Sequence, residues 1–190
     1  KSLSQNFLID KNICKKIIKQ TNINDNIVLE IGPGYGFLTD FILAKKPKKL
    51  FLVEKDNNLI KILKKKYELN KNVFFIDKDI FKIDLKSLKN IIIISNLPYN
   101  ISTKIILHLF KYNMNILEMI VMIQKEVAEK FDYNLSNMNK YKFLTKLVSD
   151  YQRCFDVSHK VFIPKPKVNS SVVKFKFRGK FIDFNKANSF

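Results

Sequence analysis

The segment Glu30-Ile31-Gly32-Pro33-Gly34-Tyr35-Gly36 holds three glycines, directly after a β-branched run and before a helical pattern. Glycine lets the backbone turn tightly and approach a ligand with no side chain in the way. The spacing is G-x-G-x-G, which differs from the G-x-G-x-x-G of proteins that bind a dinucleotide pyrophosphate. The segment therefore predicts a turn that can cradle a small ligand. The alternative is a strand-to-helix turn that holds no ligand.

Two carboxylates follow the next two apolar runs of the chain. Glu54 closes one run 20 residues after Gly34, a position from which it can accept hydrogen bonds from both hydroxyls of a ribose. Asp79 follows the next run, where it can meet the amino group of an adenine. A glycine turn, a ribose-binding acid and an adenine-facing acid together predict a pocket for an adenosyl ligand. S-adenosylmethionine fits this description.

The segment Asn96-Leu97-Pro98-Tyr99 points to a reaction on an amine, and it directly follows an isoleucine run. In an open α/β sheet, ligands bind at the carboxyl ends of the strands. The exocyclic amine of adenine is a poor nucleophile because its lone pair is delocalised into the ring. If the side-chain oxygen of Asn96 and the backbone carbonyl of Pro98 accept its two hydrogens, the nitrogen becomes pyramidal. Its lone pair can then point at a sulfonium methyl.

Tyr99 would stack on the base and hold it edge-on to these two acceptors. Such a site catalyses by orientation and by hydrogen bonds that strengthen in the transition state. It needs no strong general base, because the amine becomes acidic once it is alkylated. The alternative is an ordinary turn after a strand, in which Asn and Pro are common.

The remaining candidate residues are less specific. Phe162, which precedes a loop stiffened by two prolines, could supply the second face of an aromatic clamp around a flipped adenine, or it could be a rigid core anchor. Residues 5–8 (Gln-Asn-Phe-Leu) have no interpretation from physics alone, a loop packed over the ligand being one option. His108 and His159 lack companions at catalytic or metal-ligating spacing, so we interpret both as structural or surface residues.

The elements that position these residues alternate between strands and helices. Apolar β-branched runs predict strands, and capping residues followed by apolar residues at helical spacing predict helices. The expected strands are residues 27–31, 50–53, 73–76, 91–94 and 116–123. The expected helices are residues 37–43 and 125–131, and three more that begin near residues 10, 56 and 102. This alternation predicts an α/β fold in which helices cover both faces of a mostly parallel sheet.

The pattern changes after Tyr151. Residues 171–177 alternate between apolar side chains, such as Val173 and Phe175, and lysines. This alternation predicts a half-exposed antiparallel strand. Residues 134–142 are polar and predict a loop.

Composition and charge limit the domain number, the partners and the compartment that the chain can have. The 190 residues suit one domain, or one domain and part of another. The net charge of +18 is compatible with an RNA-binding surface, but 33 of the 35 basic residues are lysines, so solvated lysine faces are an equal alternative. No apolar run approaches the roughly 18 residues of a membrane span, which predicts no membrane partner. Cys14 and Cys154 lack a partner motif, which predicts neither a disulfide nor a zinc site and favours a reducing compartment.

Taken together, these segments resemble the ribosomal RNA adenine dimethyltransferases of the KsgA/Erm type. The resemblance covers almost the whole chain and is specific in combination. The QNFL and QKEVAEK forms resemble the bacterial and organellar small-subunit branch. The matching stretches are SQNFLID (4–10), EIGPGYGFLT (30–39), NLPYNIS (96–102), QKEVAEK (124–130) and FIPKPKVNSSVV (162–173).

The resemblance implies a Rossmann-like, seven-stranded, S-adenosylmethionine-dependent methyltransferase domain over residues 1–178. The implied reaction is the transfer of two methyl groups to each of one or two adjacent adenines near the 3′ end of small-subunit rRNA, within an immature ribosomal subunit, by a monomer that needs no metal. By matching positions, the implied cofactor-binding residues are Asn6, Leu8, Gly32, Gly34, Glu54, Asp79 and Asn96. The residues implied around the target adenine are Asn96, Pro98, Tyr99 and Phe162.

The sequence departs from the family pattern in two places. A helical RNA-binding domain would normally follow, so residues 179–190 are expected to be the start of a truncated C-terminal domain, with weaker RNA affinity as the result. A Tyr-Gly-Arg-type stretch is replaced by Tyr141-Lys142-Phe143, which leaves the loop geometry open there.

Two other functions and more than one compartment stay open at this point. The large-subunit branch, which confers macrolide resistance, shares these motifs, and a non-catalytic nucleic-acid-binding factor could be built on the same fold. The chain starts at Lys1 rather than Met and shows no secretory signal, so we expect processing or trimming at this end. A bacterial protein of this type would be cytoplasmic, whereas a eukaryotic one would act in a mitochondrion or plastid.

Overall fold

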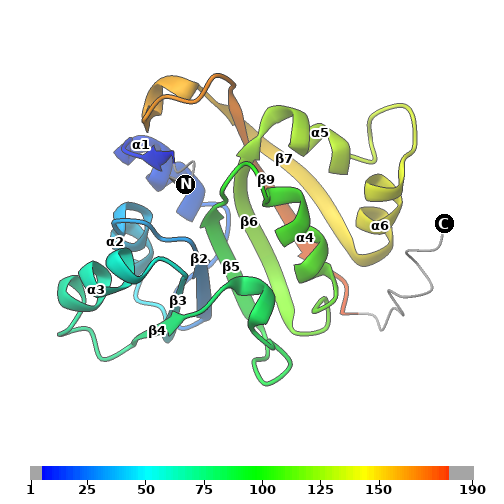
Figure 1. Ribbon diagram of the computed structural model, residues 1–190. Helices are drawn as coiled ribbons and strands as arrows, with labels where there is room; N and C mark the ends of the chain where they lie inside the picture. Colours follow the sequence, from blue (N-terminus) through cyan, green and yellow to red (C-terminus); the bar gives the residue numbers. More distant parts are fainter. Residues whose placement is uncertain (1–5, 180–190) are drawn as a thin grey trace.

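A seven-stranded sheet forms the middle of the computed structural model, which describes residues 6–179 (Figure 1). The last two strands in spatial order are β9 (Ser170–Phe177), antiparallel to β6, and β7 (Ser149–Val157), antiparallel to β9. The first five strands are parallel, in the order β4 (Val73–Asp77), β3 (Lys49–Glu54), β2 (Ile27–Ile31), β5 (Ile91–Asn96) and β6 (Ile116–Gln124). The chain runs outward from β2 to β4 and then returns to the other side of β2. The order therefore reverses between β2 and β5, the position at which such sheets bind ligands.

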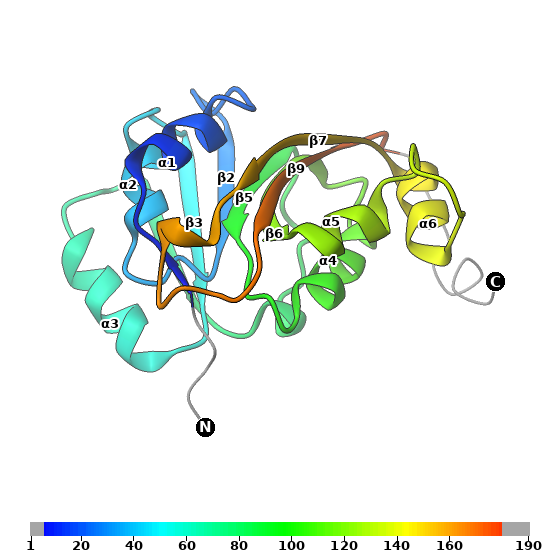
Figure 2. The same ribbon diagram turned by 90° about the horizontal axis from the view of Figure 1, so that it is seen from above.

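Three helices cover each face of the sheet (Figure 2). One face carries α1 (Lys11–Ile18), α2 (Phe37–Leu43) and α3 (Asn57–Lys66), and the other carries α4 (Ser102–Phe110), α5 (Lys125–Phe131) and α6 (Lys140–Val148). The isoleucine run of β5 serves both layers: Ile91 and Ile93 pack toward α4–α6, while Ile92 and Ile94 pack toward α1–α2. Burial on both faces is the reason that this strand is continuously apolar.

Side-chain caps set the start of several helices. Asp10 accepts hydrogen bonds from the backbone N–H groups of the first turn of α1, Asp56 does the same for α3, and Asn139 does so for α6. Each cap satisfies N–H groups that have no partner inside the helix. The caps thus fix the residue at which each of these three helices begins.

A small second sheet joins a segment near the N-terminus to a segment late in the chain. β1 (Phe7–Leu8) pairs antiparallel with β8 (Phe162–Ile163), so that Leu8 lies opposite Phe162. The short helix η2 (His159–Val161) leads directly into β8, whereas η1 (Ile80–Lys82) lies between β4 and β5. The pairing places the N-terminal segment beside the loop that carries the conspicuous Phe-Ile-Pro-Lys-Pro sequence.

The structure confirms the α/β fold and the predicted parallel strands, with ends that differ by up to two residues. Residues 171–177 are antiparallel as predicted, but they form an inner strand with neighbours on both sides. The prediction of a loop through residue 142 was wrong, since α6 begins at Lys140. The buried Lys142 donates from its ammonium to the carbonyls of Leu135 and Ser136 and so fastens the preceding loop to the helix.

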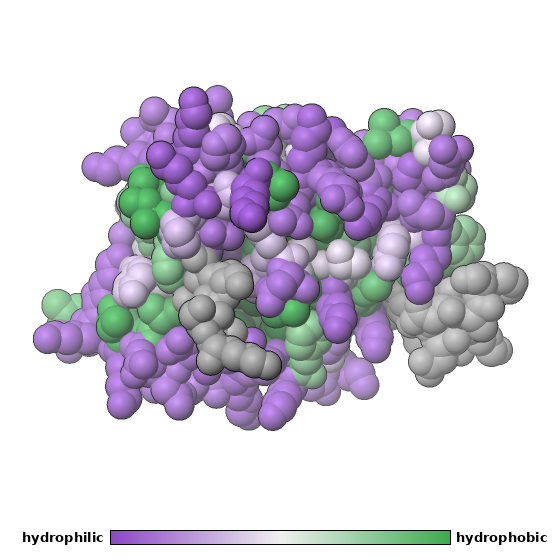
Figure 3. Space-filling view, turned by 45° about the horizontal axis from the view of Figure 1, so that its top comes forward, coloured by the Kyte–Doolittle hydropathy of each residue, from purple (hydrophilic) through white to green (hydrophobic). Residues whose placement is uncertain are grey.

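Hydrophilic residues cover most of the face shown in Figure 3, with small hydrophobic areas between them. Within residues 6–179, no helix combines the length and apolarity needed to cross a membrane. A further C-terminal domain is expected to begin over residues 179–190. Of these, only Gly179 belongs to the described residues.

Candidate active site

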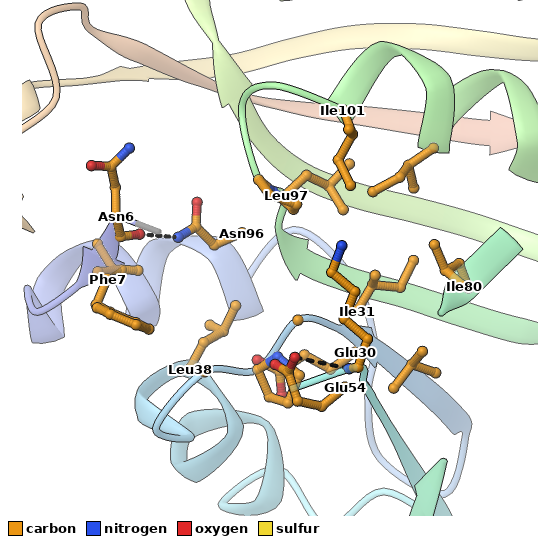
Figure 4. A pocket seen from close by; sticks show the side chains of 18 of the residues that line it. Asn6, Phe7, Glu30, Ile31, Leu38, Glu54, Ile80, Asn96, Leu97 and Ile101 are labelled. Carbon is orange, nitrogen blue, oxygen red and sulfur yellow. Dashed lines mark hydrogen bonds between the residues drawn. The ribbon is translucent and has the colours of Figure 1, made fainter. Parts of the chain in front are cut away.

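The predicted residues meet in one pocket at the carboxyl ends of β2, β3 and β5. Of the ten site residues predicted from the sequence, nine line it and Phe162 does not. Residues from β1 and from the loops after β4 and β5 close its sides (Figure 4). The members of this set are Asn6, Leu8, Gly32, Gly34, Glu54, Asp79, Asn96, Pro98 and Tyr99.

Glu30, the first residue of the glycine segment, also lines the pocket. Phe162, the remaining predicted site residue, is fully buried in the core between the sheet and α1–α2. Its ring lies edge-on to that of Tyr99, with 6.3 Å between centroids and 74° between planes. This burial favours the core-anchor interpretation in the structure as it stands, and the role of Phe162 as the second face of an aromatic clamp stays a prediction.

The glycine turn is shaped by what packs behind it. Gly34 has φ +59°, and a Cβ atom there would lie 2.9 Å from the ring of Phe7, which β1 places over the turn. Gly36 has φ +78°, and its Cβ atom would lie 2.4 Å from the hydroxyl of Tyr67. That hydroxyl donates toward the Gly36 carbonyl and the Asp40 carboxylate. The loop therefore has no room for a Cβ atom at these two positions, because Phe7 and Tyr67 fill the space; close approach of the backbone to a ligand stays a prediction.

Glu54 and Asp79 each bind backbone N–H groups through their carboxylates. Oε1 of Glu54 accepts the backbone N–H groups of Lys55 and Asp56 at 2.9 and 3.0 Å, and the Gly34 N–H also interacts with this carboxylate. Burial of this side chain raises the pKa of Glu54, an effect that the backbone N–H groups of Asp56, Lys55 and Gly34 oppose. Asp79 caps η1 through Oδ1, which accepts from the Phe81 N–H at 3.1 Å.

Asn96, the last residue of β5, presents an unpaired acceptor. Its Nδ2 donates to the backbone carbonyl of Asn6 at 3.1 Å, which Figure 4 shows as a dashed line. Among residues 6–179, its buried Oδ1 has no hydrogen-bond partner. Buried polar atoms are almost always paired, so this acceptor is open to a donor from water or from a ligand in the pocket. The Asn6 contact uses a backbone atom, and no side-chain pattern in the sequence could have predicted it.

The turn after Asn96 supplies the second predicted acceptor. The carbonyl of Pro98 accepts from the Ile101 N–H at 3.2 Å, and a carbonyl oxygen has a second lone pair for another donor. Tyr99 is half-buried, and its hydroxyl lies 2.5 Å from the hydroxyl of Ser170 at the start of β9. Burial raises the pKa of Tyr99, so the phenol is neutral at physiological pH.

Sequence reasoning missed the chemistry of Glu30. Its side chain is 2% exposed at the floor of the pocket, and Thr39 donates to its Oε2 at 2.7 Å. Burial raises the pKa of Glu30 to about 8, although the Thr39 hydrogen bond lowers it in part. The glycine segment includes Glu30, but its partner Thr39 lies nine residues later, on α2. Nothing in the sequence indicated that these two side chains meet. Among residues 6–179, no group of three or more His, Cys, Asp and Glu side chains is placed to hold a metal.

The raised pKa of Glu30 gives a stability prediction with a definite sign. Between pH 4.5 and about 8, the unfolded chain has released this proton and the folded chain has retained it, so stability falls as pH rises. The slope from one such group is at most about 1.4 kcal/mol per pH unit. Glu30→Gln keeps an acceptor for Thr39 but cannot ionise, so it should flatten this part of the profile. Thermal unfolding measured from pH 5 to pH 8 in both proteins checks this, and equal slopes would contradict it.

Three comparisons with known proteins agree with this geometry. The family model described as "Ribosomal RNA adenine dimethylase" matches residues 1–190. The "Ribosomal RNA small subunit methyltransferase A" of Pelagibacter ubique is 40% identical over 185 residues, which cover 92% of this chain and 69% of the relative. A dimethyladenosine transferase from Plasmodium falciparum has a TM-score of 0.81 at 28% identity, covering 97% of this chain and 66% of that structure. The 23S rRNA methyltransferase ErmE has a TM-score of 0.83 at 22% identity, covering 97% of this chain and 75% of that structure, which shows a shared fold.

Proposed function

Since this chain belongs to the ribosomal RNA adenine dimethylase family, we propose that it methylates the exocyclic amine of adenine near the 3′ end of small-subunit rRNA, with S-adenosylmethionine as the methyl donor. The relatives of this chain that are 36–40% identical carry the name of the small-subunit enzyme, which supports this branch. The immature ribosomal subunit is the proposed substrate, with two methyl groups added to each of one or two adjacent adenines. We further propose a monomer, which would be cytoplasmic in a bacterium and would act in a mitochondrion or plastid in a eukaryote.

The observation that carries this proposal is the unpaired Oδ1 of Asn96. An incoming adenine amine can donate one hydrogen to this oxygen and the other to the free lone pair of the Pro98 carbonyl. Because Asn6 holds the amide by its Nδ2, the acceptor is fixed before the base arrives. Pre-oriented acceptors of this kind lower the barrier because they need not reorganise during the reaction.

The rest of the pocket fits the adenosyl donor. When bound, S-adenosylmethionine supplies an electrophilic methyl group on a sulfonium. We assign ribose binding to the carboxylate of Glu54 and adenine binding to the carboxylate of Asp79, both of which line the pocket. The glycine turn allows close approach of the backbone. The full proposed set for this ligand is Asn6, Leu8, Gly32, Gly34, Glu54, Asp79 and Asn96.

Methyl transfer from labelled S-adenosylmethionine tests the proposal directly. Immature small subunits that lack the modification, large subunits and free RNA are incubated in parallel with the full chain. We expect label in the small subunits alone, at two methyl groups per modified adenine. Label in the large subunit would assign the protein to the resistance branch. A protein that binds no cofactor would instead be a non-catalytic nucleic-acid-binding factor.

A further inference from the structure

We propose that Ser170 is a positioning residue for Tyr99, an inference that rests on the proposed function. The Ser170 hydroxyl lies 2.5 Å from the Tyr99 hydroxyl, although the two residues are 71 positions apart in the chain. Tyr99 lies in the pocket and Ser170 does not, so Ser170 can act only through the tyrosine. Its proposed task is to fix the ring that stacks on the target adenine.

Ser170 is held more firmly than an ordinary loop residue. It is fully buried at the first position of β9, between Gln124 of β6 and Val157 of β7. The preceding Asn169 accepts the Lys125 N–H through its backbone carbonyl and the His159 N–H through its side chain. Strands on both sides and these two hydrogen bonds leave the Ser170 hydroxyl little freedom to move.

Tyr99, by contrast, lies in the turn between β5 and α4, where the ladder of the sheet has ended. Its backbone carbonyl accepts from the Ser102 hydroxyl at 3.2 Å, which fixes the start of the side chain but not the ring. The ring of Tyr99 packs edge-on against the ring of Phe162. The hydrogen bond to Ser170 fixes the far tip. A ring fixed at its tip keeps one orientation, and a base that stacks on it is presented to the acceptors of Asn96 and Pro98 in one pose.

A double-mutant cycle on methyl transfer to immature small subunits tests the inference. Ser170→Ala should lower kcat about tenfold, the effect of losing one orienting hydrogen bond, with the KM for S-adenosylmethionine unchanged. Tyr99→Phe keeps the ring and removes the same hydrogen bond, so it should cause a similar loss. In the double variant, we expect no loss beyond that of either single variant.

Ser171→Ala is the matched control. Ser171 is the next residue of β9, is equally buried, and donates to Asp156 at 2.7 Å on the other face of the strand. Its loss should change kcat less than about twofold, because its partner lies away from the pocket. Wild-type kcat in Ser170→Ala would overturn the inference, as would losses that multiply in the double variant. If the wild-type protein itself leaves small subunits unlabelled, the proposed function fails, and the inference fails with it.

Discussion

Replacing Asn96 by alanine is expected to lower methyl transfer to small subunits by about 10²–10³-fold, the range found when one pre-oriented polar group is removed from a reaction centre. The variant loses the buried Oδ1, which no described residue donates to. It also loses the hydrogen bond that ties β5 to the Asn6 carbonyl. The rate with labelled S-adenosylmethionine at saturating substrate measures the effect. A rate above one-tenth of wild type would be about tenfold above the predicted range. Such a rate would show that another group accepts the amine hydrogens.

Asn113→Ala controls for the general effect of removing a buried asparagine. Asn113 is also buried, its Oδ1 also lacks a partner, and its Nδ2 also donates to a backbone carbonyl, that of Phe110. It lies between α4 and β6, outside the pocket. This variant should lose stability without a comparable loss of rate. Equal losses of rate in the two variants would indicate that Asn96 matters only for folding.

Gly36→Ala is expected to lower the free energy of unfolding by about 3 kcal/mol, and the midpoint of thermal unfolding by about 10 °C. Two causes add. Alanine is strained at φ +78°, and its Cβ atom would lie 2.4 Å from the Tyr67 hydroxyl. Tyr67 is buried and cannot move away without breaking its hydrogen bonds to Gly36 and Asp40. Thermal unfolding followed by circular dichroism measures the shift.

Gly179→Ala separates these two causes. Gly179 has φ +62°, but among residues 6–179 no atom would lie within 4 Å of a Cβ atom there. Strain alone should therefore cost about 1 kcal/mol, or about 3 °C. Adding Tyr67→Phe to Gly36→Ala removes the closest atom of the clash and should recover part of the lost stability. If Gly36→Ala and Gly179→Ala unfold at the same temperature, the contact with Tyr67 does not matter.

The sequence predicted those parts of the fold that depend on local patterns. The strand residues 27–31 and the helices at 37–43 and 125–131 have the expected bounds, because an apolar run or a helical periodicity identifies each of them. It also predicted which residues share the pocket, since carboxyl ends of neighbouring parallel strands meet at one edge of the sheet. Their roles toward cofactor and adenine stay predictions.

Features that depend on partners distant in the chain were not predictable in this way. α6 was missed because its buried Lys142 looks like a surface residue until its two carbonyl partners are known. β7 was missed because polar residues interrupt its apolar pattern. The burial of Phe162 depends on its pairing with Leu8, 154 positions earlier. The partner of Asn96 is a backbone carbonyl, which any residue type could supply.

The position of β9 has a consequence for synthesis of the protein. β9 is the last strand of this sheet along the chain, yet it lies between β6 and β7. Until residue 177 has left the ribosomal tunnel, β6 and β7 have no strand to join them, and both present unpaired edges of the kind that invite aggregation. β1 likewise cannot pair until β8 has been made, and the Tyr99 hydroxyl cannot form its hydrogen bond until Ser170 has been made. The pocket is therefore among the last parts of the molecule to assemble, and a nascent chain becomes competent only when nearly all of this domain has emerged.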